Sequence, residues 1–177
     1  TREDEHCWEP YGSAMQCNLQ ASVNSNGEIT SWSHETFSDT FLTRPVNGKD
    51  PGSRLLSTHY LKESRPWPVT PPMLTVHGGI HRNIEPIYNF PSPRLVKHRV
   101  YDLPLRTSAL RALGAFGNIF AIESMMDELA EAIKLDPFHF RLKHLNDEQG
   151  IQTLIRLQEL VDKDRVNFPQ EAGLGIS

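Results

Sequence analysis

Apolar and polar residues alternate along residues 15–23 of this chain. The apolar positions are Met15, Cys17, Leu19, Ala21 and Val23, with Gln, Asn or Ser between them. A period of two is typical of a β-strand with one buried face. Residues 24–27 (Asn-Ser-Asn-Gly) tolerate the positive φ angles of a tight turn, and residues 28–37 are rich in side chains that favour strands. The pattern therefore predicts an antiparallel β-hairpin.

The next region, residues 43–93, is dominated by proline. Its prolines are Pro45, Pro51, Pro66, Pro68, Pro71, Pro72, Pro86, Pro91 and Pro93. Proline interrupts helices, so we expect an ordered loop with one short helix near residues 55–61, followed by a further β segment at 94–101. Eight apolar side chains of the loop are expected to be buried: Met73, Leu74, Val76, Ile80, Ile84, Ile87, Tyr88 and Phe90.

The pattern changes to helical spacing after residue 118. Apolar residues recur at steps of three and four, which indicates a helix with one core-facing side; they are Ile119, Ile122, Met126, Leu129, Ala130 and Ile133. Asp136 and Pro137 are typical of an N-cap and first helical position, and predict a second helix to about residue 146. A third helix is expected at 152–163, with Leu154, Leu157, Leu160 and Val161 as its apolar face. The fold class is therefore α+β, with one domain over residues 1–165. We expect residues 166–177 to be a loose tail or the start of a truncated strand.

Composition narrows the function classes. The chain has 177 residues, a net charge of −4 and 38% hydrophobic residues, which fits one folded domain and argues against a general nucleic-acid binder. No apolar run is long enough for a membrane span. Two cysteines, Cys7 and Cys17, make no disulfide framework, and we expect Cys17 to be a small buried residue. The chain starts without Met and ends with Gly-Leu-Gly-Ile-Ser, so we expect an excerpt of a longer protein; its cellular compartment cannot be inferred.

The segment that is the strongest candidate for a ligand-binding site is 103–118, which leads directly into the first helix. Small residues and glycines let a backbone approach a ligand closely, and the N-terminus of the helix offers free N–H groups for an oxyanion. The alternative is an ordinary turn between a strand and a helix.

Metal sites are weakly supported. Glu123 and Asp127 share a helix face, but the simpler interpretation is a polar helix surface. His77 and His81 flank two glycines, and the competing interpretation is a surface loop. We interpret His139 and His144 as surface or cap residues, and Met125 and Met126 as core residues. The basic residues Arg94, Lys97, His98 and Arg99 are expected on a solvated strand face.

Several segments together resemble one enzyme family. They are residues 108–114 (Ser-Ala-Leu-Arg-Ala-Leu-Gly), 120–130, 136–145, 8–15 and 82–91. They resemble the molybdopterin-binding large subunit of molybdenum hydroxylases, the family of xanthine dehydrogenase and aldehyde oxidase. The likeness is greatest to the bacterial isoquinoline 1-oxidoreductase type, and it covers residues 1–161 and 173–177.

The resemblance implies a molybdenum-dependent oxidoreductase that hydroxylates N-heterocycles or oxidises aldehydes, with water as the oxygen source. It implies a molybdopterin cofactor, in the mononucleotide or cytosine dinucleotide form, beside the backbone of Leu110, Arg111, Ala112, Leu113 and Gly114. It also implies an iron–sulfur subunit or domain as electron acceptor, and the rest of the large subunit as a partner.

The chain departs from the family pattern in three respects. Leu113 occupies the position of a phenylalanine that stacks on purines in the xanthine enzymes. The family's glycine-rich pterin loop and its catalytic glutamate base are both absent, so no catalytic residue and no metal ligand is assigned here. We therefore expect the chain alone to be inactive. The alternative is a non-catalytic binding or assembly module derived from the same fold, and a weaker one is a small metalloprotein built on His77 and His81.

Overall fold

The fold is that of a computed structural model, which describes residues 3, 11–39, 41, 56–64, 71–76, 78–101, 103–104, 107–164, 167–169, 173 and 175–176. Its strands are β1 (Tyr11–Gly12), β2 (Gln16–Val23), β3 (Ile29–Ser38), β4 (Arg94–Arg99) and β5 (Thr107–Ser108). Its helices are the 3-10 turns η2 (Leu56–Tyr60) and η3 (Gly79–His81), and α2 (Ala115–Ala132), α3 (Pro137–His144) and α4 (Glu148–Asp164). No helix among the described residues is long and apolar enough to cross a bilayer.

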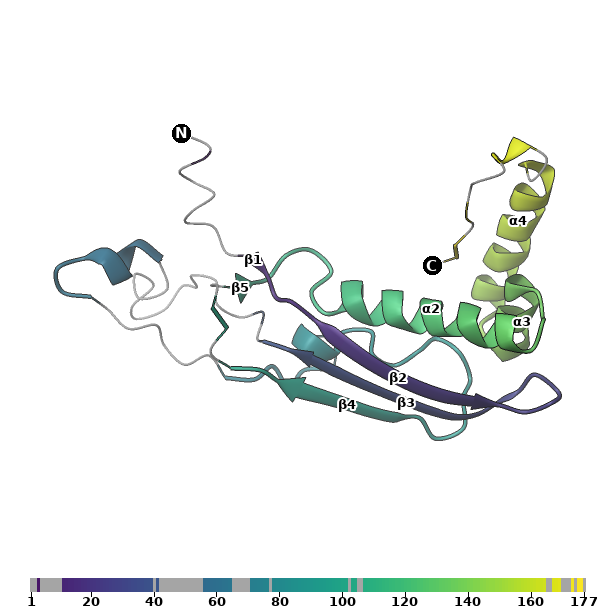
Figure 1. The fold of residues 1–177 in the computed structure, drawn as a ribbon, viewed down its shortest axis with the longest axis horizontal. Helices are drawn as coiled ribbons and strands as arrows, with labels where there is room; N and C mark the ends of the chain where they lie inside the picture. The colour runs from purple at the N-terminus through teal and green to yellow at the C-terminus, as the bar shows by residue number, and fades with distance from the viewer. Residues whose placement is uncertain are drawn as a thin grey trace.

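The predicted hairpin is confirmed and forms most of the main sheet. β2 and β3 are antiparallel, with Leu19 opposite His34, and Gly27 in their turn has a φ of 73°. β4 pairs in parallel with β3, which gives the strand order β2-β3-β4 (Figure 1). A short parallel pair, β1 with β5, forms a separate two-stranded sheet. These strands and the three helices confirm the α+β class.

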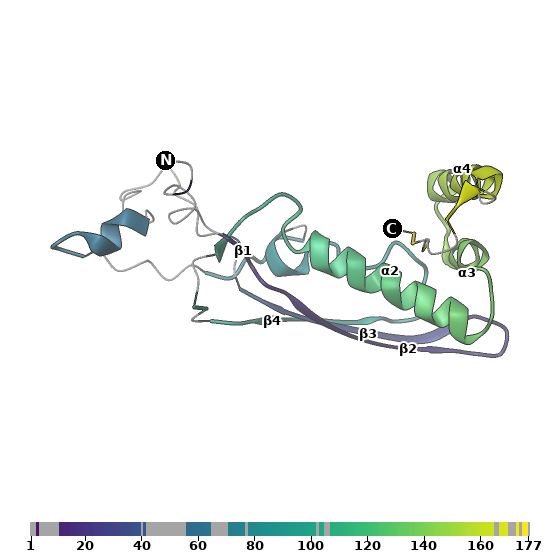
Figure 2. The same ribbon diagram turned by 45° about the horizontal axis from the view of Figure 1, so that its top comes forward.

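Helix α2 lies across one face of this sheet, as Figures 1 and 2 show. Alternate residues of β3, including Trp32, His34 and Thr36, are buried. The residues between them make polar contacts elsewhere, since Glu35 forms ion pairs with Arg94 and His98 of β4. In Figure 2 no helix of the described chain covers the face of the sheet opposite α2, which is the arrangement expected when one face packs on the core and the other is polar.

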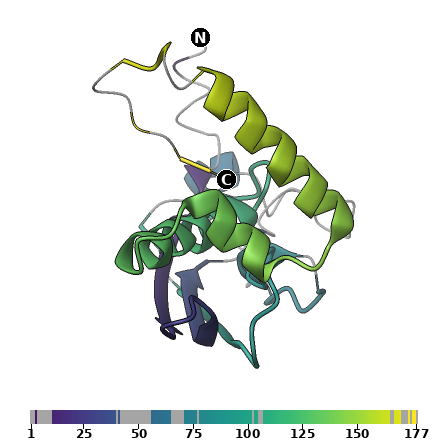
Figure 3. The ribbon, with the colours of Figure 1, turned by 90° about the vertical axis from the view of Figure 1, so that its right-hand side faces the viewer.

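The other two helices lie at the end of the sheet where the hairpin turns, with α4 packed against α3 (Figures 1 and 3). The predicted cap of α3 is confirmed, because the Asp136 side chain accepts from Phe138 N at 2.9 Å and His139 N at 3.1 Å. Pro137 occupies the first turn, where its missing N–H has no cost. The predicted helix at 152–163 extends a turn further toward the N-terminus and begins at Glu148.

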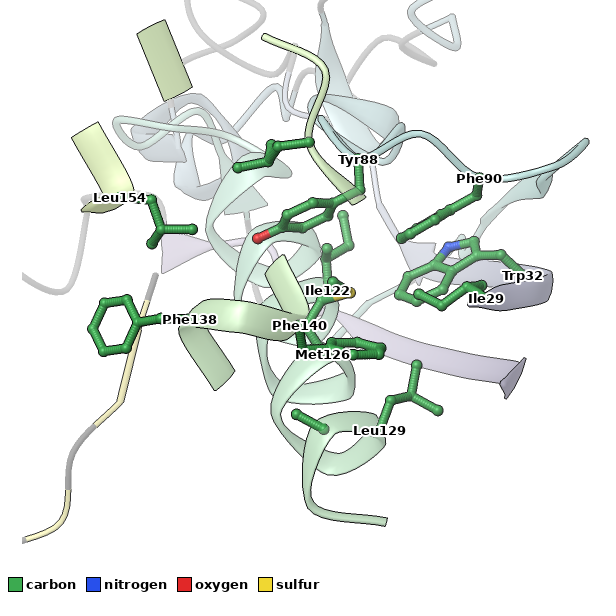
Figure 4. Packing of buried hydrophobic residues seen from close by; sticks show 12 residues of the cluster. Ile29, Trp32, Tyr88, Phe90, Ile122, Met126, Leu129, Phe138, Phe140 and Leu154 are labelled. Atoms are coloured by element: carbon green, nitrogen blue, oxygen red, sulfur yellow. The ribbon is translucent and has the colours of Figure 1, made fainter. Parts of the chain in front are cut away.

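The main hydrophobic core lies between α2, α3 and the hairpin end of the sheet (Figure 4). Met126 and Phe140 are fully buried, and the rings of Trp32 and Phe90 are 4.6 Å apart. The predicted core stripe of α2 is confirmed in its centre, where Ile122, Met126, Leu129 and Ala130 are buried, whereas Ile119 and Ile133 are half-buried.

A buried ionic network ties α2 to α3. Arg141 is 1% exposed; its Nε donates to Glu123 Oε2 at 2.9 Å and its Nη1 to Asp127 Oδ1 at 2.7 Å. The Tyr88 hydroxyl also donates to Glu123, at 2.9 Å to Oε2. Burial and the Glu123 carboxylate raise the pKa of the Tyr88 hydroxyl. The prediction that Glu123 lies on a polar helix surface is therefore wrong, because α3 covers it with a matching cation.

The placement of His144 on the surface is also wrong, whereas the alternative of a position at a helix end fits, because His144 is the last residue of α3. His144 is buried; its Nε2 accepts from Ile29 N at 3.1 Å, and its Nδ1 donates to the Phe140 carbonyl at 2.8 Å. The start of β3 supplies the Ile29 N–H, and the preceding turn of α3 supplies the Phe140 carbonyl. His139 is exposed, as predicted.

Some apolar residues expected in the core are exposed. In the proline-rich region Ile80, Ile84, Tyr88 and Phe90 are buried, whereas Leu74, Val76 and Ile87 are not. On α4, Leu154 is buried but Leu157 and Leu160 remain exposed. On α4 the spacing is that of a core face, but in the described chain the core covers only part of it.

Candidate functional site

The segment from Leu110 to Gly114 forms a tight turn that leads into α2. The Leu113 N–H donates to the Leu110 carbonyl at 3.2 Å, and the Ala115 N–H donates to the Ala112 carbonyl at 3.0 Å. Ala112 and Leu113 have φ angles of 74° and 54°. Residues other than glycine rarely adopt this left-handed region, which costs roughly 1–3 kcal/mol per residue. The surrounding structure must therefore hold the turn in place.

The loop that contains Gly78 and Gly79 provides this support. The Gly114 N–H donates to the Gly79 carbonyl at 3.1 Å. A Cβ atom on Gly114 would lie 2.3 Å from the Ile80 carbonyl oxygen and 2.5 Å from that of Gly79. Only glycine allows so close an approach of two backbones, so this contact fixes the turn against the loop.

Asn118, in the first turn of α2, holds the same loop through hydrogen bonds from its side chain. Its side chain is fully buried, and its Nδ2 donates to the carbonyls of Ile80 at 2.8 Å and Arg82 at 2.9 Å. Its Oδ1 accepts from the Cys17 Sγ atom of β2 at 3.7 Å. Cys17 is a free, half-buried cysteine. The turn, the loop and β2 are thus held together by one buried amide.

The turn presents backbone donors that the described chain does not use. Within the described residues, the N–H groups of Arg111 and Ala112 donate to no acceptor, and Gly114 gives α2 no side-chain cap. Unpaired amides at a turn and at the positive end of a helix favour an electron-rich ligand. None of the five turn residues carries a side chain that could act as a general base at neutral pH.

An open cavity of about 950 Å³ lies beside the turn. We call it the groove; its walls are residues 12–15, β2, the turn and one side of α2, and they include Met15, Leu110, Arg111, Leu113, Phe116 and Phe120. Phe116 is 81% exposed and Phe120 is 72% exposed. Arg111 and Glu128 are the charged residues among its lining side chains. A mostly apolar wall with a few polar groups is typical of a site for a small organic molecule.

The structure brings together only part of the predicted site. Leu110, Arg111 and Leu113 line the groove, whereas Gly114 is buried against the loop. Sequence reasoning missed the roles of Gly79 and Asn118. Two adjacent glycines were a signal of close backbone approach, but the partner of that approach, Gly114, lies far along the chain.

The metal alternatives find no geometric support. Glu123 and Asp127 both bind Arg141, and the His81 Nε2 donates to the Thr75 carbonyl at 2.7 Å. His77 lies outside the described residues. No group of three His, Cys, Asp or Glu residues in the described part of the chain could hold a metal ion.

The basic strand is not uniformly solvated. Arg94 is exposed, as predicted, but Lys97 is half-buried, and its Nζ donates to the Met73 carbonyl at 2.7 Å and to His81 Nδ1 at 3.0 Å. Residues alternate between the two faces of a strand, and the loop covers the face that carries Lys97.

A buried histidine lies on the same face of the sheet as the loop. His34 of β3 is fully buried, and neither ring nitrogen has a hydrogen-bond partner among the described residues. Burial lowers the pKa of His34 to about 4. A backbone contact with Ile84, which falls short of hydrogen-bond geometry, acts weakly in the opposite direction. His34 is therefore neutral at pH 7.

Comparison with known proteins gives consistent matches. Residues 69–145 match the molybdopterin cofactor-binding domain. A subunit of the nicotinate dehydrogenase of Pseudomonas putida is 35% identical over 151 residues, which are 85% of this chain and 11% of that protein. The beta subunit of the isoquinoline 1-oxidoreductase of Brevundimonas diminuta is 25% identical over 99% of this chain and 20% of that protein. The chain therefore spans a tenth to a fifth of the length of these relatives.

Solved structures share the fold. The aldehyde oxidoreductase of Desulfovibrio gigas superposes with a TM-score of 0.60 and 17% identity, over 92% of this chain and 16% of that one. Quinoline 2-oxidoreductase of Pseudomonas putida 86 superposes with a TM-score of 0.61 and 12% identity, over 94% of this chain and 20% of that one. The chain is therefore homologous to part of the molybdopterin-binding subunits of molybdenum hydroxylases, which confirms the family predicted from its sequence.

Proposed function

We propose that this chain forms one wall of a molybdopterin centre in an oxidoreductase that hydroxylates N-heterocycles or oxidises aldehydes. The observation that carries the proposal is the turn at Leu110–Gly114, which presents two unused backbone amides beside an open, mostly apolar groove. The names of the relatives refer to nicotinate and isoquinoline, and those of the structural neighbours to quinoline and aldehydes. These are flat N-heterocycles or small carbonyl compounds.

The turn could hold the cofactor through its backbone N–H groups. When bound, the cofactor supplies the metal-centred oxidation of the substrate, with water as the source of oxygen. The amides of Arg111 and Ala112 would donate hydrogen bonds to its electron-rich oxygen or sulfur atoms. Backbone donors do not titrate, and they are already oriented by the strained turn, so they stabilise negative charge at little reorganisation cost.

The groove would hold the organic part of the substrate. Leu113 and the exposed rings of Phe116 and Phe120 form an apolar surface suited to a flat ring or a short acyl chain. Such a surface excludes water but offers few groups for specific recognition. The choice of substrate therefore depends on polypeptide that faces this wall.

The finer assignments belong to the same proposal. We infer that the pterin is the cytosine dinucleotide form, that electrons leave through an iron–sulfur subunit or domain, and that residues 1–165 act as one unit within the large subunit. The chain spans 11% and 20% of the relatives. The catalytic base and the rest of the cofactor site would come from outside it.

A first test uses the chain by itself. We expect the purified 177-residue chain to contain no stoichiometric molybdenum and to show no dye-linked oxidation of N-heterocycles or aldehydes. Metal analysis and a dye-reduction assay measure both properties. Molybdenum at one atom per chain, together with turnover, would contradict the view that this wall is only part of the site.

A second test adds one methyl group to the turn, in a full-length large subunit that contains this chain. Gly114→Ala should lower both the molybdenum content and kcat by more than tenfold, because a Cβ would fall 2.3 Å from the Ile80 carbonyl oxygen and displace the turn. Gly150→Ala on α4 is the matched control, since the added Cβ meets only the Asp147 side chain, with a nearest atom at 3.2 Å. Equal molybdenum contents and rates in the two variants would refute the assignment of the turn.

A further inference from the structure

A second, smaller cavity lies between β4 and the loop that supports the turn. Its volume is about 190 Å³, and its walls are Pro72, Met73, Gly79, Ile80, Lys97 and Arg99. It shares no lining residue with the groove. The volume is enough for a small ion with its water, since one water molecule occupies about 30 Å³ in the liquid.

The two charged residues of this cavity are both cations. Lys97 and Arg99 are two positions apart on β4, so they share a strand face. This is the opposite face from Arg94 and His98, which pair with Glu35. The Arg99 guanidinium lies 4.5 Å from the centre of the Tyr101 ring, and its Nε is 3.4 Å from Asp39 Oδ1. The Arg99 side chain is only 13% exposed.

Lys97 has neutral partners only. Its Nζ donates to the Met73 carbonyl and to His81 Nδ1. Because that Nδ1 accepts, the His81 proton is on Nε2, which donates to the Thr75 carbonyl, and the ring is neutral. Lys97 makes no ion pair with a carboxylate in the described part of the chain. An ammonium group has three donors, so one N–H remains for a further acceptor.

The local charge balance therefore favours an anion. Two half-buried cations line one small cavity; Arg99 pairs with Asp39, whereas Lys97 forms no ion pair with a carboxylate of the described chain. A half-buried charge without a counterion is unfavourable, and burial lowers the pKa of Lys97. An oxyanion would neutralise this charge and would accept from the remaining donor of Lys97. Arginine and lysine are the usual ligands for phosphate groups.

We propose that the cavity formed by Lys97, Arg99 and the Gly79 loop binds one tetrahedral oxyanion of the phosphate class. This site is separate from the groove and does not depend on the function proposed above. It is mechanically linked to the turn, however, because the Gly79 carbonyl that accepts from Gly114 N belongs to a residue that also lines the cavity. An oxyanion bound in this cavity would stabilise the conformation of the loop, and therefore that of the turn.

The test is a calorimetric titration of the full 177-residue chain with inorganic phosphate in a chloride buffer. We expect saturable 1:1 binding, and a melting temperature that rises with phosphate concentration because the ligand binds the folded state. Lys97→Met should weaken binding at least tenfold. Arg94→Met, on the other face of the same strand, is the matched control and should change the affinity by less than twofold.

A second variant keeps the test informative if Lys97→Met does not fold, as judged by circular dichroism. Lys97→Arg retains the charge and should bind phosphate within about threefold of the unchanged chain. Absence of a saturable signal at 10 mM phosphate with the unchanged chain would overturn the proposal. Equal affinities of the folded Lys97→Met and Arg94→Met variants would overturn it as well.

The source of the anion can be distinguished in the same experiment. Cytidine monophosphate is titrated as a phosphate ester, and inorganic phosphate as the free ion. Tighter binding of the ester, lost in Lys97→Met, would identify the ligand as an organic phosphate. Binding of inorganic phosphate alone would identify it as the free ion. Tighter binding of acetate than of either phosphate would contradict the tetrahedral class.

Discussion

The two faces of α2 differ sharply in what surrounds them. On one face Met126 and Ala130 are fully buried, and the neighbouring Glu123 and Asp127 bind the buried Arg141. On the other face Phe116 and Phe120 are among the most exposed apolar side chains of the described chain, and Glu128 continues the wall of the groove. Ahead of the helix the backbone passes through two left-handed residues.

This difference separates stability from function within one helix. One face of the helix packs on the core, whereas the other forms an apolar wall of the groove, next to the turn whose amides have no acceptor among the described residues. Exposed apolar patches and strained backbone are features of binding sites. The contrast therefore supports a packed core on one face of the helix and a ligand surface on the other.

Two buried histidines show the same division. His144, at the helical end, has hydrogen-bond partners for both ring nitrogens. His34, near the supporting loop, is fully buried but has none among the described residues. The two histidines therefore differ in whether their buried ring nitrogens have partners among the described residues.

The largest effect is expected from breaking the ionic network. Arg141→Met leaves Glu123 buried without its cation, so we expect a loss of about 3–5 kcal/mol in the free energy of unfolding. Urea denaturation of the chain measures it. Arg156→Met on α4 removes an exposed pair with Glu159 and should cost under about 1 kcal/mol. Similar losses in both variants would remove the distinction between the packed face of α2 and the surface.

The next largest effect is a pH dependence of the free energy of unfolding, which His34 should cause. Because the pKa of folded His34 is about 4, against an ordinary histidine value of 6.5, the unfolded chain binds more protons between these values. Stability therefore falls as the pH drops through 6.5 toward 4, by roughly 2 kcal/mol from pH 7 to pH 5 for this residue.

Urea denaturation at both pH values checks this prediction. His34→Leu removes the titrating ring and should flatten the decline by about that amount. His139→Gln, at an exposed position, should leave the decline unchanged. An undiminished decline in His34→Leu would show that another group is responsible.

The smallest effect is expected at the groove. Phe120→Ser removes an exposed ring and should change the free energy of unfolding by less than about 0.5 kcal/mol. Met126→Ala, less than two turns further along the same helix, should cost about 2–5 kcal/mol because it leaves a cavity. Thermal melts of the two variants compare them directly. A large loss from Phe120→Ser would mean that the open face of α2 also serves the core.

Particular residues show how far the sequence predicts the fold. The alternation at residues 15–23, the Gly27 turn and the Asp136 cap were identified correctly, because each depends on neighbours within a few positions. The burial of Glu123 and of His144 was not, since their partners Arg141 and Ile29 lie 18 and 115 residues away. The site is divided in the same way. The segment 103–118 was singled out by its glycines and small residues, and the family resemblance pointed within it to Leu110–Gly114, but neither the groove nor the second cavity was predicted.

The sequence by itself determined the local elements, the α+β class and the family, because periodicity, capping and motif order are written in short segments. Only the tertiary structure decided which carboxylate is paired, which glycine meets which backbone, and which face of α2 stays open. These outcomes depend on distances between segments far apart in the chain. Such distances cannot be read from local sequence patterns, because they are set only when β2, the loop and α2 pack together.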